Sequence, residues 1–317
     1  MTSDASVAAA ARPVTLELEG ATFRRAGAAL SAPLSLRSDA RRIGLVGAWE
    51  PLFLALSGQA SVSSGIARIF GCEIESALAR GVVGFAPCDP QLPASFTVRE
   101  YLEHAARLNH GSRARARDDA RRTLEDLGLG ELTQLQLGRL VPHQARALGI
   151  AFAALTTPAV LCLETPLRGL DAASADYVAR LCAHVAERSS VILSSALPQS
   201  PSAERALLEA CDELFRLEHG ALVAQGPPLA VFAPGARYLL TLTGSQHTEL
   251  ALALTRAGCK LTAQAAPTEF SGLLAPDRVV TRYLVELPEA GSPDLLLDSA
   301  LGAGVTVLEL EPLLSGS

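Results

Sequence analysis

The sequence predicts an α/β domain with a largely parallel sheet, followed by a smaller α+β domain. Short apolar strands alternate with longer helical segments through roughly the first 235 residues, which is typical of a parallel sheet covered by helices. Beyond residue 236 the order becomes strand, helix, strand, strand, helix, strand, which is the ferredoxin-like order. We therefore expect a flexible tail over residues 1–12, an α/β domain over 13–235 and a ferredoxin-like domain over 236–317.

The composition argues against several classes of protein. A formal net charge of −6 gives no reason to expect a nucleic-acid partner. The arginine-rich segment 112–130 also carries interleaved acidic residues, which indicates a solvated helix face. The six cysteines form no C-x-x-C pair, so they indicate reduced core thiols of a cytosolic protein rather than disulfides or a zinc site.

The first half of the α/β domain begins with strands. Residues 14–20 alternate apolar and polar side chains, which predicts a half-buried antiparallel strand. The run 43–46 is continuously apolar and predicts a buried strand, and residues 52–58 look helical. Residues 65–71 predict an edge strand, and residues 81–87 a further strand.

The second half contains three clear helix signals. Thr97 and Glu100 have the spacing of a capping box, so a helix should follow them. Residues 147–163 carry no charge and approach the length of a membrane span. The Thr-Thr-Pro sequence at 156–158 instead indicates that a helix ends there and a buried strand follows. Asp171 is a good N-cap for another helix.

Two strands complete the α/β domain. Residues 190–195, "SVILSS", predict a buried strand. The segment 214–226 predicts a hairpin that turns at His219 and Gly220.

The stretch "GLVGAWEPLFLALSG", residues 44–58, begins like a phosphate-binding loop and then departs from one. A phosphate-binding loop comes directly after a strand. It contains several glycines, a lysine and a serine or threonine, and its backbone and side-chain groups hold phosphate and Mg²⁺. Gly44 and Gly47 are in place here. Ala48, Trp49 and Glu50 follow them, and then Pro51.

Further motifs follow in a recognisable order: "SGIARIFG", "GFAPCDPQLPASFTVREYLEHAARL", "AVLCLETPLRGLD", "VILSS" and "CDELFRLEHGALVAQGPP". With these motifs, residues 14–235 resemble the ATP-binding subunit of ABC transporters, particularly export-type subunits with a small C-terminal domain. The resemblance implies a P-loop-NTPase-like domain with a mixed sheet and a helical subdomain. It also implies ATP with Mg²⁺ as cofactor and a cytoplasmic location at the inner face of the membrane.

The resemblance also shows where this chain departs from the family at the phosphates. Trp49 stands about where the family has its lysine, and Glu50 stands where it has the serine or threonine that binds Mg²⁺. The loop is about four residues short. An acidic residue repels phosphate and Pro51 lacks an N–H, so we expect this loop to form no phosphate cradle.

The remaining positions of the family's site also differ. Glu164 occupies the position of the aspartate that holds Mg²⁺, and a carboxylate there can still contact a metal. Thr165 occupies the position of the catalytic glutamate, and its hydroxyl is too weak a base. Cys88 stands in place of the Mg²⁺-sensing glutamine, and Ala196 in place of the switch histidine.

The family's signature helix, which contacts the nucleotide of the partner subunit, is altered as well. Its serine and two glycines correspond here to Val141, Pro142 and His143. We expect His143 to be a helix-start residue without a ligand. Asp171, in an intact "GLD" sequence, keeps the family's dimer-contact position, although helix capping alone explains it. Phe23 is near the family's adenine-stacking position, but a role in the core explains it better.

Three functions remain open. The first is a pseudo-ATPase that scaffolds or regulates a heteromeric export complex, binding ATP without efficient hydrolysis or not at all. The second is an active ATPase with displaced ligands, for which Arg41, Arg42 and Arg168 are the candidate cations. The third is an interaction module of a non-transport assembly. The resemblance implies a membrane permease and a second, competent ATP-binding subunit as partners, in a homodimer or heterodimer.

Overall fold

The computed structural model describes residues 13–198, 202–232, 237–244, 247–264, 280–288 and 293–313. The chain divides into two compact units, the first ending at Val231 and the second beginning at Phe232. Within these described ranges, no helix combines the length and the apolar character needed to cross a membrane. Each unit has its own hydrophobic core.

The first unit opens with an antiparallel sheet in the order β2-β1-β5-β6, with β3 paired to β1. Its strands are β1 (Leu16–Arg25), β2 (Ala28–Ala29), β3 (Leu34–Ser38), β5 (Ser61–Ile69) and β6 (Cys72–Glu73). β1 is antiparallel to its neighbours, as its alternating sequence predicts. The prediction that residues 65–71 form an edge strand is wrong. Strand β5 pairs with β1 on one side and with the short β6 on the other.

A six-stranded sheet forms the centre of the first unit, in the order β11-β10-β4-β9-β8-β7. Its strands are β4 (Arg42–Gly47), β7 (Val83–Ala86), β8 (Val160–Leu163), β9 (Ser190–Ser195), β10 (Glu213–Glu218) and β11 (Ala221–Gly226). All neighbours are parallel except β10 and β11, which form the predicted hairpin. His219 and Gly220 both have positive φ at its turn, as a tight hairpin turn requires.

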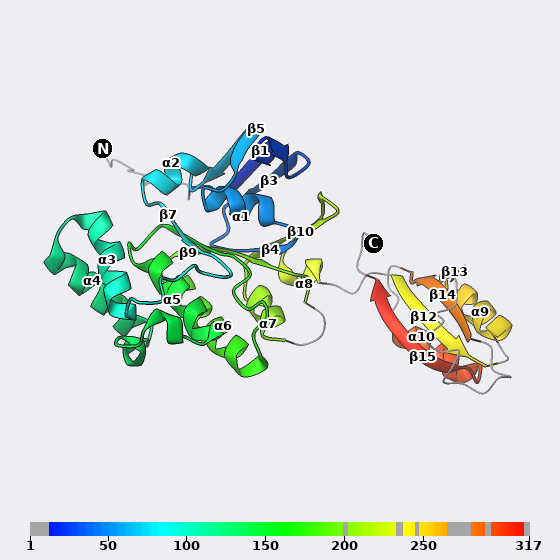
Figure 1. Ribbon diagram of the computed structural model, residues 1–317. Coiled ribbons are helices and arrows are strands. Elements are labelled where there is room, and N and C mark those ends of the chain that lie inside the picture. The colour runs from blue at the N-terminus through cyan, green and yellow to red at the C-terminus, as the bar shows by residue number, and fades with distance from the viewer. Residues whose placement is uncertain are drawn as a thin grey trace, which may run out of the picture. The chain divides into compact units, whose positions relative to one another are not determined.

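Helix α1 (Glu50–Leu56) lies between the two sheets, and helices α5 to α7 cover the other face of the central sheet (Figure 1). Buried side chains of both sheets and of α1 form one core cluster. The other helices of this unit are α2 (Ile74–Ala79), α3 (Val98–His110), α4 (Arg113–Asp126), α5 (Pro142–Ala154), α6 (Ala172–Ala186), α7 (Ala203–Glu209) and α8 (Pro228–Val231). The mixed sheet with a helical part is the predicted fold class.

Local capping signals set several of these helix ends. The capping box of α3 is formed: Thr97 Oγ1 accepts from the Glu100 backbone N–H at 3.2 Å, and Glu100 Oε2 accepts from the Thr97 backbone N–H at 2.9 Å. The uncharged run 147–163 is the end of α5, a turn and β8. Thr157 lies in that turn with φ of 48°, so the helix stops where the sequence predicts.

The second unit is a four-stranded antiparallel sheet in the order β13-β14-β12-β15. Its elements follow the predicted ferredoxin-like order: β12 (Arg237–Thr243), α9 (His247–Arg256), β13 (Lys260–Gln264), β14 (Val280–Glu286), α10 (Asp294–Gly302) and β15 (Thr306–Leu313). Leu240, Leu250, Leu254 and Leu296 are fully buried in its core. The two helices therefore pack their apolar faces against the sheet.

Candidate functional site

The residues predicted for a nucleotide site lie along the edge where the parallel strands of the central sheet end. Strand pairing aligns these ends, since Val46 lies opposite Ser195 and Leu163 lies opposite Leu193. Ligand sites of open α/β sheets lie at this edge. The strand ends and the loops that follow them supply Gly47, Cys88, Glu164, Thr165 and Ala196.

The connection between β4 and α1 is only Ala48 and Trp49, because the strand ends at Gly47 and the helix begins at Glu50. Trp49 turns inward and is 1% exposed. Its indole Nε1 donates to the carbonyl oxygen of Val46 at 3.1 Å, and its backbone N–H donates to the carbonyl oxygen of Gly47 at 3.0 Å. The indole therefore belongs to the core between the two sheets.

Packing accounts for both glycines of this stretch. A Cβ on Gly47 would lie 2.1 Å from the carbonyl oxygen of Leu217, and the residue has φ of +100°. A Cβ on Gly44 would lie 2.3 Å from Cδ2 of Leu214. Gly47 excludes a side chain because of the backbone of β10, whereas at Gly44 the Leu214 side chain would have to shift; neither constraint involves a ligand.

Glu164 directs one carboxylate oxygen into the protein. Its Oε2 accepts a hydrogen bond from the backbone N–H of Cys88 at 3.2 Å, which ties the end of β8 to the loop after β7. Cys88 itself is 4% exposed. Across the described ranges, no group of three or more His, Cys, Asp and Glu side chains is placed to hold a metal ion.

Thr165 is held in an unusual backbone conformation, with φ of 37°. A β-branched residue rarely adopts positive φ, so the surrounding contacts impose it. Its backbone N–H donates to Ser194 Oγ at 3.0 Å. Its own Oγ1 is buried and has no hydrogen-bond partner among the described residues.

Arg146 is a site residue that the sequence analysis missed. The guanidinium is buried and donates to the carbonyl oxygens of Thr165 and Pro166, at 3.0 Å each. It also reaches the carbonyl oxygen of Arg168 at 3.3 Å and Asp89 Oδ1 at 3.4 Å. One α5 side chain thus fixes the loops after β7 and β8. The available signal was its position as the last charge before the uncharged run of α5.

The start of α5 is closed by its own side chains. Gln144 Oε1 accepts from the backbone N–H of Val141 at 3.2 Å, and Pro142 contributes no N–H. His143 lies in the first turn of α5, as the sequence predicts: its Nδ1 lies 3.1 Å from Ser174 Oγ, and its ring meets that of Tyr177 edge-on.

Asp171 caps α6 as the sequence predicts. Its Oδ1 accepts from the backbone N–H of Ser174 at 3.0 Å, and its Oδ2 accepts from the Ser174 hydroxyl at 2.8 Å. These hydrogen bonds, the backbone one first, lower the pKa of Asp171. Ser174 therefore links Asp171 to His143 and joins the first turns of α5 and α6.

Two of the candidate cations are misplaced. Arg42 begins β4, about 16 Å from Gly47 along an extended strand, and Arg41 precedes it, so both lie at the opposite edge. Arg168 does lie near the site, where its Nη2 is 3.6 Å from Asp89 Oδ2. Phe23 is fully buried in the core, as expected.

The chain is similar to several curated ATP-binding proteins. It is 25% identical over 171 residues to the uncharacterized ABC transporter ATP-binding protein YxlF of Bacillus subtilis, a match that covers 54% of this chain and 55% of YxlF. It is 30% identical over 181 residues to the Nod factor export ATP-binding protein I of Paraburkholderia xenovorans, covering 56% of this chain and 58% of that protein. No family model matches the chain.

Solved structures agree with these relatives. cbiO1 of Clostridium perfringens, part of an ABC transporter complex, superposes with a TM-score of 0.59 at 20% identity and covers 70% of this chain and 91% of cbiO1. The ATP-binding subunit of another ABC transporter superposes with a TM-score of 0.56 at 18% identity, covering 68% and 91%. This is the ABC ATPase fold.

The resemblance to ABC transporter ATP-binding subunits is thus found in both sequence and structure. The chain spans about half the length of the two curated relatives named above. The edge at Gly47, Glu164 and Ala196 is where the resemblance predicts the nucleotide site. Fold alone does not establish the chemistry of that site.

Proposed function

We propose that this chain is a nucleotide-binding-domain-like subunit of an ABC transporter that acts as a pseudo-ATPase, with a scaffolding or regulatory role in a heteromeric export complex. The observation that carries the proposal is the buried indole of Trp49, where an active subunit has its phosphate loop. Mg·ATP as the family binds it does not fit these residues.

The first support for this proposal is the connection between β4 and α1, where the family binds the phosphates. A phosphate cradle needs several backbone N–H groups aimed at one point and a nearby cation. The connection here is only Ala48 and Trp49, and the Trp49 N–H is turned to Gly47. Glu50 places a carboxylate at the start of α1 and Pro51 removes a donor, so both residues oppose phosphate binding.

The hydrolytic end supports it independently. Activation of water needs a general base with a pKa near the working pH, and the Thr165 hydroxyl is far too weak a base. Ala196 contributes no imidazole. Phosphoryl transfer relies on positioning and charge stabilisation, and a single charged group can be worth about 10³-fold in rate. Replacement of several such groups should leave very little turnover.

The helix at the signature position supports the proposal as well, because its first residues have few groups left to contact a nucleotide bound on a partner subunit. The Val141 N–H is taken by Gln144, and His143 is engaged by Ser174. By the resemblance, the partners are a membrane permease and a second, competent ATP-binding subunit, in a homodimer or heterodimer. The location is then cytoplasmic, at the inner face of the membrane. No nucleic-acid partner is proposed.

Calorimetric titration of the full chain with Mg·ATP tests the proposal, with the fluorescence of Trp49, the only tryptophan, as a second readout. We expect neither heat of binding nor a fluorescence change up to about 1 mM nucleotide. Phosphate release should equal that of a sample without protein. Micromolar binding of ATP without turnover would contradict the scaffolding role and would favour a regulatory subunit that senses nucleotide. Binding with turnover would overturn the pseudo-ATPase and favour the ATPase with displaced ligands.

A further inference from the structure

A cavity of about 650 Å³ opens at the edge of the central sheet opposite to the candidate site. It lies where strands begin: Arg42 is the first residue of β4, Val191 is the second of β9, and Asp212 precedes β10. The rest of its lining comes from the end of α6 with Glu187, from α7 and the two residues after it, from Leu193 on β9, and from residues 39–41 before β4. Its volume is within the range of about 300–1,000 Å³ that is usual for small-molecule sites.

One part of the lining is apolar. It consists of Ala183 and Ala186 on α6, Leu207 on α7, and Val191 on β9. The thiols of Cys182 and Cys211 also line the cavity, and burial raises the pKa of each to about 12. Both thiols are therefore uncharged at neutral pH and extend the apolar surface.

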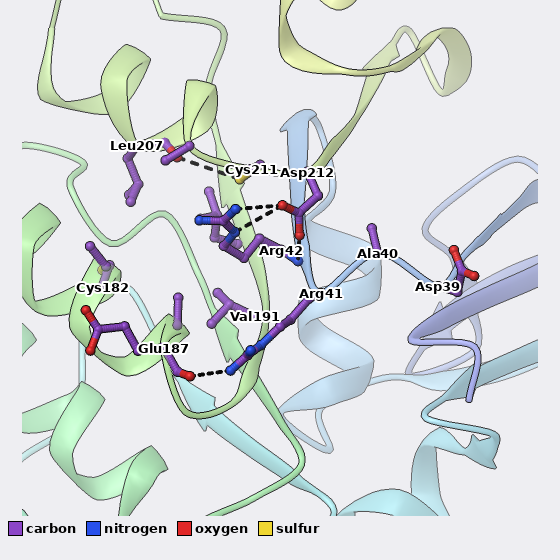
Figure 2. A pocket seen from close by; sticks show the side chains of 14 residues that line it. Asp39, Ala40, Arg41, Arg42, Cys182, Glu187, Val191, Leu207, Cys211 and Asp212 are labelled. Atoms are coloured by element: carbon purple, nitrogen blue, oxygen red, sulfur yellow. Dashed lines mark hydrogen bonds and ion pairs between the residues drawn. The ribbon is translucent and has the colours of Figure 1, made fainter. Parts of the chain in front are cut away.

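The two arginines of the cavity differ in how their charges are matched (Figure 2). Arg42 meets Asp212 through Nη2 at 2.7 Å and Nε at 3.2 Å, and its backbone N–H also donates to that carboxylate. This pair is internally neutral. The Arg41 Nη2 donates only to the backbone carbonyl oxygen of Glu187, and no carboxylate of the described residues lies within ion-pair distance of it.

Two carboxylates at the rim do not neutralise Arg41. The Glu187 side chain is 73% exposed and lies 3.7 Å from His184 Nδ1. Asp39 is exposed and lies on the far side of the cavity from Glu187 (Figure 2). Exposed charges are screened by water and salt. Arg41 is exposed as well, and apart from its hydrogen bond to the Glu187 carbonyl oxygen its guanidinium donors have no partner among the described residues, so they can meet a ligand at the cavity mouth.

We propose that this cavity binds a small amphipathic monoanion, a carboxylate on a compact apolar body. The carboxylate meets the guanidinium of Arg41, which suits two parallel hydrogen bonds to such a group. The apolar body lies on Ala183, Ala186 and Leu207. Strand β4 separates this cavity from the edge that holds Trp49, so the proposal is independent of nucleotide binding.

Calorimetry on the full chain with 2-naphthoate, and with the neutral 2-naphthamide as its matched ligand, tests the proposal. We expect 2-naphthoate to bind in the sub-millimolar range and the amide about tenfold more weakly, because only the carboxylate pairs with Arg41. Arg41→Gln should weaken 2-naphthoate about tenfold and leave the amide unchanged. Arg25→Gln, at the exposed end of β1, is the control and should change neither.

A second variant addresses the apolar wall and does not depend on Arg41. Ala186→Leu places a larger side chain in the cavity and should weaken both ligands about tenfold. Thermal unfolding followed by circular dichroism confirms that each variant is folded, and Arg41→Met, which also removes the charge, replaces Arg41→Gln if the latter unfolds. The absence of heat with 2-naphthoate up to about 5 mM would overturn the proposal. Equal affinities of acid and amide, or binding that neither variant changes, would overturn it as well.

Discussion

Trp49 Nε1 donates to the carbonyl oxygen of Val46, so the indole ring folds back onto the end of strand β4. This contact joins two residues that are three apart in sequence, and it removes a backbone acceptor and a large aromatic ring from water together. A phosphate loop would instead direct backbone donors outward to a ligand. The same stretch of chain that serves a ligand in the family here serves the hydrophobic core.

Replacement of Trp49 by alanine should therefore act on stability. We expect Trp49→Ala to lower the free energy of unfolding by about 3–5 kcal/mol, the usual cost of removing a buried tryptophan. Trp49→Phe should cost less, because one aromatic ring is kept, although the hydrogen bond to Val46 and part of the buried volume are lost. Urea unfolding followed by circular dichroism measures both. Leu229→Ala, at an 87% exposed position, is the control and should stay within about 0.5 kcal/mol of the wild type.

Alanine substitutions at two glycines with positive φ distinguish the cost of backbone strain from the cost of a steric collision. Gly47→Ala should destabilise the fold by several kcal/mol, because its Cβ would collide with the backbone oxygen of Leu217 at 2.1 Å. Gly58→Ala has φ of +74° and open space around it, so only about 1 kcal/mol of backbone strain is expected. The two variants are compared by urea unfolding. Equal losses would mean that Gly47 is not sterically required.

Arg146 should be a stability determinant of the candidate site. Arg146→Met leaves the carbonyl oxygens of Thr165 and Pro166 buried without their donor, and each such group costs about 1–3 kcal/mol. We expect a total loss of about 2–5 kcal/mol in thermal or urea unfolding. Arg139→Met, on an exposed arginine nearby, should be close to neutral. A loss confined to the Arg139 variant would contradict the role given to Arg146.

The Asp171 cap should make α6 sensitive to acid. Its pKa lies below the ordinary value of 3.8, so the ionised form is stabilised by folding. That contribution is fully present above the unfolded pKa and is lost as the pH falls through the folded one. Wild type should therefore melt at a higher temperature than Asp171→Asn at neutral pH. The difference should shrink below about pH 4, and a constant difference down to pH 2 would argue against this origin.

A single restored residue should not return catalysis. We expect Thr165→Glu to show no ATP turnover above the wild type, because the connection at Ala48 and Trp49 still cannot hold the phosphates. Phosphate release under saturating Mg·ATP measures this, with Thr165→Gln as the isosteric control for the carboxylate. Turnover in the glutamate variant alone would show that the phosphate end of the site is intact.

Local sequence signals located most of the elements of the first unit correctly. The capping box at Thr97, the N-cap at Asp171 and the turn at His219 each follow from residue chemistry within a few positions, and the structure has all three. The β5 strand was predicted as an edge, because pairing with the two-residue β6 depends on a turn that residue patterns do not reveal. Helix α1 also begins two residues earlier than predicted, at Glu50.

The order of strands and helices, the resemblance to ABC transporter subunits and the residue types at each predicted nucleotide-site position all follow from the amino-acid sequence. Those properties depend on hydrophobic period and on short motifs, which are local. Tertiary structure alone decided that Trp49 turns inward, that Arg146 reaches the carbonyl oxygens after β8, and that Arg41 and Arg42 lie at the far edge of the sheet. Each of these depends on which strands become neighbours, and that is set by packing between segments far apart in the chain.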